Sequence, residues 1–143
     1  MKKALVILSV IAAAISLTSC HLEGATTHTE DYTIEPTAWL ANDGALASDK
    51  YYYISCEADF ITKAVCEDGA VNAYVWLEGP KTWTPLPYVY LYMAAQGMGT
   101  QAVAENFRFE YAPGEITFII QDMNGSLPVP MADPYTFRVT VTR

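Results

Sequence analysis

The stretch that decides the fold runs from Gly69 to Met93 and reads G-A-V-N-A-Y-V-W-L-E-G-P-K-T-W-T-P-L-P-Y-V-Y-L-Y-M. Residue types alternate along both ends of this stretch, and such a period of two is typical of β-strands whose two faces differ. The Gly-Pro pair and the Pro-rich segment in its middle predict a turn region. We therefore expect two consecutive strands, each with an aliphatic face and an aromatic face.

The two faces of these strands lead to different expectations. The aliphatic face carries Val71, Ala73, Val75, Leu77, Val89, Leu91 and Met93. The aromatic face carries Tyr74, Trp76, Tyr88, Tyr90 and Tyr92, with Trp83 between the strands and Asn72 and Glu78 as polar neighbours. A sandwich core takes the aliphatic face, which leaves the aromatic face for solvent, a ligand or a partner. In the alternative, the register is inverted and these rings form the core.

The rest of the chain repeats the pattern of short alternating strands between Pro and Gly turns. We expect further strands at residues 32–35, 51–58, 107–111, 116–121 and 135–142, and a long loop at 94–104 that is a candidate binding edge. Thr62 and Gly69 are good capping residues for one short helical turn between two strands. The fold class is therefore all-β, an immunoglobulin-like β-sandwich of about seven strands, with a small barrel as the alternative.

The first twenty residues are typical of an export signal. Lys2 and Lys3 precede an apolar run at residues 4–15 that is too short to span a bilayer comfortably, and Leu17-Thr18-Ser19-Cys20 follows. These four residues resemble a bacterial lipobox. The resemblance implies a lipoprotein signal peptide at 1–19 and acylation of Cys20 by chains such as palmitate; an ordinary secretory signal is the alternative. A flexible tether at 20–31 and a β-sandwich domain at 32–143 complete the expected organisation.

The charge of the chain excludes some partners. Eight basic residues face sixteen acidic ones, and removal of Lys2 and Lys3 leaves six against sixteen, a net charge of −10. An acidic surface argues against a nucleic-acid partner. Cys56 and Cys66 remain after Cys20, and in an oxidising compartment they form either a disulfide or two buried thiols.

Both histidines of the chain, His21 and His28, fall in the expected tether. A domain without histidine cannot assemble a Ser-His-Asp or Cys-His nucleophile system, or a zinc site with His ligands. Two cysteines alone are a poor metal-ligand set. We therefore expect no enzyme, no catalytic residues, no metal and no cofactor. Carboxylate pairs could serve a glycosidase in principle, but exposed acids on strands are usually solvated.

Three short motifs, together with the lipobox and tether, carry a resemblance over most of the mature chain. They are G-A-V-N-A-Y at 69–74, W-T-P-L-P-Y at 83–88 and P-Y-T-F-R-V-T-V at 134–141. With these motifs the chain resembles the small uncharacterised β-sandwich lipoproteins of gut Bacteroidetes. The resemblance implies a lipid-anchored protein of the cell envelope and outer membrane, facing either the periplasm or the outside. It implies no activity and no site.

The function expected from the residues is binding without catalysis. Exposed Tyr and Trp rings stack on the apolar face of a sugar, and amide and carboxylate groups bind its hydroxyls. The candidate ligand-binding residues are Tyr74, Trp76, Trp83, Tyr88, Tyr90 and Tyr92. The alternative is a structural or assembly component of the envelope, whose aromatic face docks on a partner protein.

Overall fold

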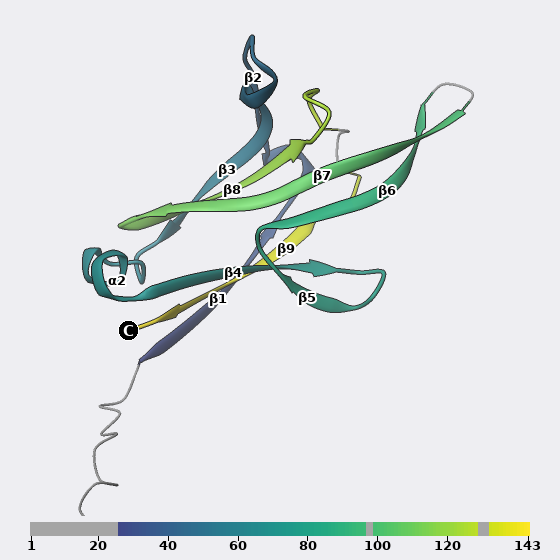
Figure 1. Cartoon of the computed structure of the whole chain (residues 1–143). Helices are drawn as coiled ribbons and strands as arrows, with labels where there is room; N and C mark the ends of the chain where they lie inside the picture. Colours follow the sequence, from purple (N-terminus) through teal and green to yellow (C-terminus); the bar gives the residue numbers. More distant parts are fainter. Residues whose placement is uncertain (1–25, 97–98, 129–131) are drawn as a thin grey trace, which may run out of the picture.

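The structure consists of two antiparallel sheets that pack face to face (Figure 1). It is a computed structural model that describes residues 26–96, 99–128 and 132–143. Sheet A has the strand order β1-β9-β4-β5, and sheet B has the order β2-β3-β8-β7-β6. The strands of sheet A are β1 (Thr27–Ile34), β9 (Tyr135–Thr142), β4 (Ala70–Leu77) and β5 (Thr82–Pro85). The strands of sheet B are β2 (Leu40–Asp43), β3 (Lys50–Ala58), β8 (Gly114–Asp122), β7 (Gly99–Ala112) and β6 (Tyr88–Gln96).

Short helical segments connect some of these strands. The 3₁₀ helices are η2 (Pro36–Ala38) and η3 (Ala47–Asp49), and the α-helix is α2 (Lys63–Asp68). Helix α2 carries the chain from β3 of sheet B to β4 of sheet A at one end of the sandwich (Figure 1). Within the described ranges, no helix is long and apolar enough to cross a membrane.

The core lies between the sheets and is built by the inward residues of the alternating strands. The rings of Phe118 in β8 and Phe137 in β9 stack across the gap, with centroids 4.2 Å apart. Ile116 and Ile120 flank Phe118, and all three are fully buried. Every buried core residue of the described part lies between residues 34 and 141. The segment from residue 26 onward therefore contains everything that the observed fold packs together.

The predicted fold class is confirmed: the described part of the chain is an all-β sandwich with one short α-helix. Thr62 and Gly69 cap that helix as expected. The described residues form nine strands rather than about seven. One reason is that β2 and β5 are only four residues long, and such short strands show too few alternations to be recognised in a sequence.

The expected orientation of the second central strand is wrong. Val89, Leu91 and Met93 of β6 are exposed by 44%, 72% and 63%, whereas Tyr88 and Tyr90 pack against the core. The cause is that β4 and β6 belong to different sheets. Both faces of β6 are apolar, so the larger rings could occupy the core. The inverted register, which was the alternative, is therefore correct for β6.

The expectation of a loop at residues 94–104 is also wrong. Strands β6 and β7 pair continuously from Tyr88 with Phe107 to Gln96 with Gly99, as one long hairpin. Figure 1 shows this hairpin extending beyond the other strands of sheet B. Small residues that lack an apolar period can join a strand when a neighbouring strand satisfies their backbone hydrogen bonds.

The tether expected at 20–31 is too long. Residues 20–25 lie outside the described residues, but strand β1 already begins at Thr27, where it pairs with Thr142 of β9. His28 therefore belongs to the folded domain, contrary to expectation. Its ring lies 4.3 Å from the ring of Phe60, and its Nε2 atom is 3.5 Å from the carboxylate of Glu30.

Candidate ligand-binding site

The six aromatic residues singled out in the sequence do not share one face. Tyr74 and Trp76 lie on the outer face of sheet A, where Trp83 of β5 pairs with Trp76. The second group is on the inner face of β6, on the other sheet, and consists of Tyr88, Tyr90 and Tyr92. A single flat aromatic platform is therefore not formed.

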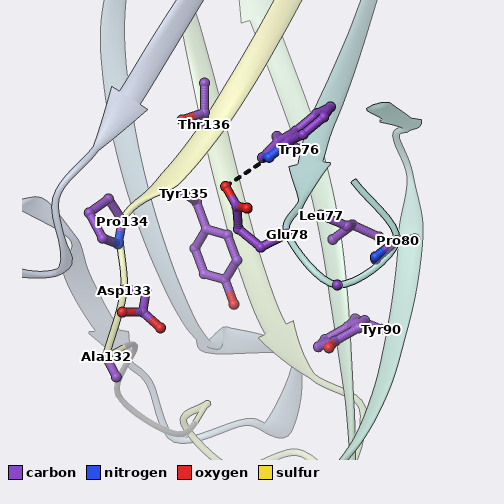
Figure 2. Close-up of a pocket in the computed structure, with 11 residues that line it drawn as sticks. Trp76, Leu77, Glu78, Pro80, Tyr90, Ala132, Asp133, Pro134, Tyr135 and Thr136 are labelled. Carbon is purple, nitrogen blue, oxygen red and sulfur yellow. Dashed lines mark hydrogen bonds between the residues drawn. The ribbon is translucent and has the colours of Figure 1, made fainter. Parts of the chain in front are cut away.

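A cleft of about 240 Å³ brings members of both groups together at the end of the sandwich where β4 ends and β9 begins. It lies between the turn that follows β4 and the segment that leads into β9, as Figure 2 shows. The lining residues are Trp76, Leu77, Glu78, Gly79, Pro80, Tyr90, Ala132, Asp133, Pro134, Tyr135 and Thr136. The cleft thus combines three aromatic rings with two carboxylates.

One wall of the cleft is made by the end of β4. Leu77 is buried in the core, whereas Trp76 points to the other side of the sheet, as alternation requires. The Nε1 atom of Trp76 donates a hydrogen bond of 2.8 Å to the carboxylate of Glu78 (Figure 2). Lys81, with φ of 54°, completes the turn that leads into β5. The indole plane and the carboxylate therefore hold one another in place.

The opposite wall and the floor carry two tyrosines. Tyr135 is the first residue of β9, and its ring lies edge-on to Phe107 at 5.1 Å. Burial, followed by the charge of Glu105, raises the pKa of Tyr135 to about 12. The hydroxyl of Tyr135 is protonated at neutral pH, as a tyrosine hydroxyl normally is, and can donate a hydrogen bond. Tyr90 of β6 contributes the third ring of the cleft.

Behind Tyr90, a buried carboxylate orders the inner face of the hairpin. The rings of Tyr90 and Tyr92 stack at 5.4 Å, and the Tyr92 hydroxyl donates to the carboxylate of Glu105 at 2.9 Å. Glu105 is only 2% exposed. Burial and this hydrogen bond both raise the pKa of Tyr92. The neutral phenol of Tyr92 thus helps to fix the rings that back the cleft.

Trp83 lies beside the cleft rather than in it. Its ring is 5.3 Å from that of Trp76, and the guanidinium carbon of Arg138 lies 4.1 Å from its centroid. Arg138 donates two hydrogen bonds of 2.8 Å to Asp31, and this contact lowers the pKa of Asp31. One face of Trp83 is therefore covered by Arg138. Trp83, Tyr74 and Arg138 also line a separate, shallow hollow of about 350 Å³.

The two cysteines that could form a disulfide are both free thiols in this structure. Cys56 is half-buried, and burial raises the pKa of its thiol. No group of three or more His, Cys, Asp or Glu residues that could hold a metal ion occurs in the described part of the chain.

The sequence pointed to three of the residues in the cleft, Trp76, Tyr90 and the polar neighbour Glu78, and missed Asp133 and Tyr135. The last two lie far from Gly69–Met93 in the chain and reach the cleft because β9 pairs with β4. The available signal was the motif D-P-Y-T-F at 133–137, where a Pro precedes an alternating aromatic strand. That motif indicated only a strand.

Comparisons with protein-family models, with curated proteins and with solved structures gave no match for this chain.

Proposed function

We propose that this chain is a cell-envelope lipoprotein, lipid-anchored at Cys20 in the outer membrane, whose domain binds glycans without modifying them. The observation that carries the proposal is the cleft in which Trp76, Tyr90 and Tyr135 surround a space bordered by Glu78 and Asp133. Aromatic rings contribute apolar contacts to a pyranose, and carboxylates accept hydrogen bonds from its hydroxyls.

The size and charge of the cleft limit the class of ligand that it can bind. Its volume of about 240 Å³ lies below the roughly 300–1,000 Å³ of pockets that hold drug-sized ligands. The cleft therefore suits one sugar ring or the end of a chain. Among the described residues that line the cleft, two have acidic side chains and none has a basic one. The two carboxylates would therefore repel an anionic sugar. We expect a neutral glycan.

The exposure of the carboxylates favours binding over catalysis. A glycosidase needs a general acid whose pKa is raised, commonly by an apolar environment. Glu78 and Asp133 are both exposed to solvent, and Glu78 already accepts a hydrogen bond from Trp76. These surroundings suit a hydrogen-bond acceptor for a bound sugar.

Calorimetric titration tests the proposal on residues 24–143, which include the whole observed core, with a panel of neutral polysaccharides. We expect saturable binding to at least one of them. Trp76→Ala should abolish this binding, and Glu78→Gln should weaken it about tenfold, the effect of losing charge-assisted hydrogen bonds worth roughly 1.4 kcal/mol. Tyr111→Ala is the matched control, because Tyr111 is an exposed ring that does not line the cleft.

Fluorescence provides a second readout. Trp39 is buried, so Trp39→Phe leaves the emission of Trp76 and Trp83, and a bound sugar should shift it. The proposal fails if no polysaccharide binds, or if binding survives in Trp76→Ala while circular dichroism shows an intact fold.

A further inference from the structure

The four sheet edges of this sandwich are not equally protected. Natural proteins shield edge strands with charges, prolines or short length, because an open edge offers unpaired backbone groups to another strand. Strand β1 carries His28, Glu30 and Asp31, β2 and β5 have four residues each, and β5 ends at Pro85. Strand β6 is the remaining edge, and it has nine residues with no charge and no proline.

The side chains around this edge form an uncharged apolar strip. Val89, Leu91 and Met93 are exposed on the outer face of β6. They pair with Asn106, Ala104 and Ala102 of β7, none of which is charged. The one acidic residue within this part of the hairpin, Glu105, faces the other side and is buried.

A long apolar edge of this kind is unfavourable in water if it stays open. Its sequence, Y-V-Y-L-Y-M-A-A-Q, combines high β-propensity with no charge and no proline, which is the composition of strands that add to other strands. In a chain with sixteen acidic and eight basic residues, such a strip is exceptional. Its chemistry fits an occupant that is itself an uncharged apolar strand.

We propose that the occupant is β6 of a second copy of this chain, paired antiparallel about a two-fold axis perpendicular to sheet B. This axis places the outer faces of both β6 strands on the same side of the combined sheet. Val89, Leu91 and Met93 therefore contact the same set of residues in the other copy, as isologous contacts require. Two sheets of five strands become one continuous sheet of ten. Each cross-strand apolar pair contributes modestly, so the dimer should dissociate on dilution.

The distribution of charge indicates where two copies of this chain can meet. Elsewhere the surface is rich in carboxylates, so most approaches of two copies are repulsive. The β6 strip lets two backbones come within hydrogen-bond distance without bringing charged side chains of β6 together. Added salt screens the remaining repulsion and should therefore strengthen the dimer.

Sedimentation equilibrium of residues 24–143 over a concentration series tests this proposal. We expect a monomer–dimer equilibrium that shifts to dimer with salt. Leu91→Lys places two like charges next to each other at the interface and removes an apolar pair, so it should weaken the dimer about tenfold or more. Leu46→Lys is the matched control: Leu46 is 65% exposed, similar to Leu91, but lies outside β6.

Hydrogen exchange then identifies the interface. Amides of β6 should become protected as dimer forms, and those of β1 should not. Met93→Lys serves as a second variant if circular dichroism shows that Leu91→Lys does not fold. A monomer at every concentration overturns the proposal and leaves the edge to a strand of another protein. A dimer that Leu46→Lys weakens equally, or that leaves β6 amides unprotected, also overturns it.

Discussion

The surroundings of three tyrosine hydroxyls keep them protonated at a higher pH than a free tyrosine. Burial is the main cause in each: it raises the pKa of Tyr32 and of Tyr135 to about 12, and it also raises the pKa of Tyr92. The hydroxyl of Tyr32 also donates to the backbone carbonyl of Glu57 at 3.0 Å, which ties β1 of one sheet to β3 of the other. The hydrogen bonds that the hydroxyls of Tyr32 and Tyr92 donate exist only while these groups are protonated.

This arrangement predicts a loss of stability in alkali. A tyrosine in the unfolded chain ionises near pH 10, so the folded state, with its raised pKa, favours the proton. That stability is complete below about pH 10 and is lost as the pH rises towards about 12. Tyr135→Phe should make this loss shallower when urea unfolding is measured across the range. Tyr111→Phe, at an exposed ring, is the control, and equal slopes in both variants would contradict the prediction.

At the scale of elements, α2 shows how a short helix is fixed at both ends. The hydroxyl of Thr62 accepts a hydrogen bond from the amide of Val65 at 3.2 Å, and the amide of Gly69 donates to the carbonyl of Val65. A Cβ atom at Gly69 would lie 2.9 Å from the carbonyl oxygens of both Val65 and Thr142. Ile61 and Val65 are buried below. The turn from sheet B to sheet A thus depends on two capping residues.

Thr62→Ala should reduce the free energy of unfolding by about 1 kcal/mol, because it removes the N-cap acceptor. Thr62→Ser keeps the hydroxyl and should cost less. Chemical denaturation followed by circular dichroism measures both differences. If Thr62→Ser costs as much as Thr62→Ala, the hydroxyl is not what stabilises the helix.

At the scale of the whole molecule, β9 unites the two ends of the domain. It pairs with β1 on one side and with β4 on the other, so the strand nearest the N-terminus is joined to the rest of sheet A only through β9. The cleft depends on the same pairing, since it joins the end of β4 to the start of β9. The proposed dimer would place two clefts on one assembly, and a polysaccharide that reached both would bind with avidity.

The proposed attachment of this molecule to the membrane is tested at Cys20. Several acyl chains hold a protein stably on a bilayer, whereas one alone is marginal. Cys20→Ser should therefore move the protein from the membrane fraction to the soluble fraction and abolish incorporation of labelled palmitate. Cys66→Ser is the control, because Cys66 lies within the folded domain. Membrane attachment that persists in Cys20→Ser would contradict the lipid anchor.

The features that could be predicted from the sequence are those with a local cause. Thr62 and Gly69 sit seven residues apart around a short helical period, and both cap α2 as expected. Ile116, Phe118 and Ile120 are fully buried on the face of β8 opposite Glu115, Thr117 and Gln121. In this strand, burying the other face would have placed the side chains of Glu115, Thr117 and Gln121 in the core, so only one orientation was favourable.

The orientation of β6 and the composition of the cleft depend on contacts between strands that are remote in the chain. In β6 the residues Tyr90 and Leu91 both suit a core, so alternation gave no preference, and the assignment of β6 to sheet B selected the rings. Asp133 and Tyr135 joined Trp76 through the pairing of β9 with β4. Strand pairing joins residues that are remote in the chain, and their contacts leave no periodic trace in a single sequence.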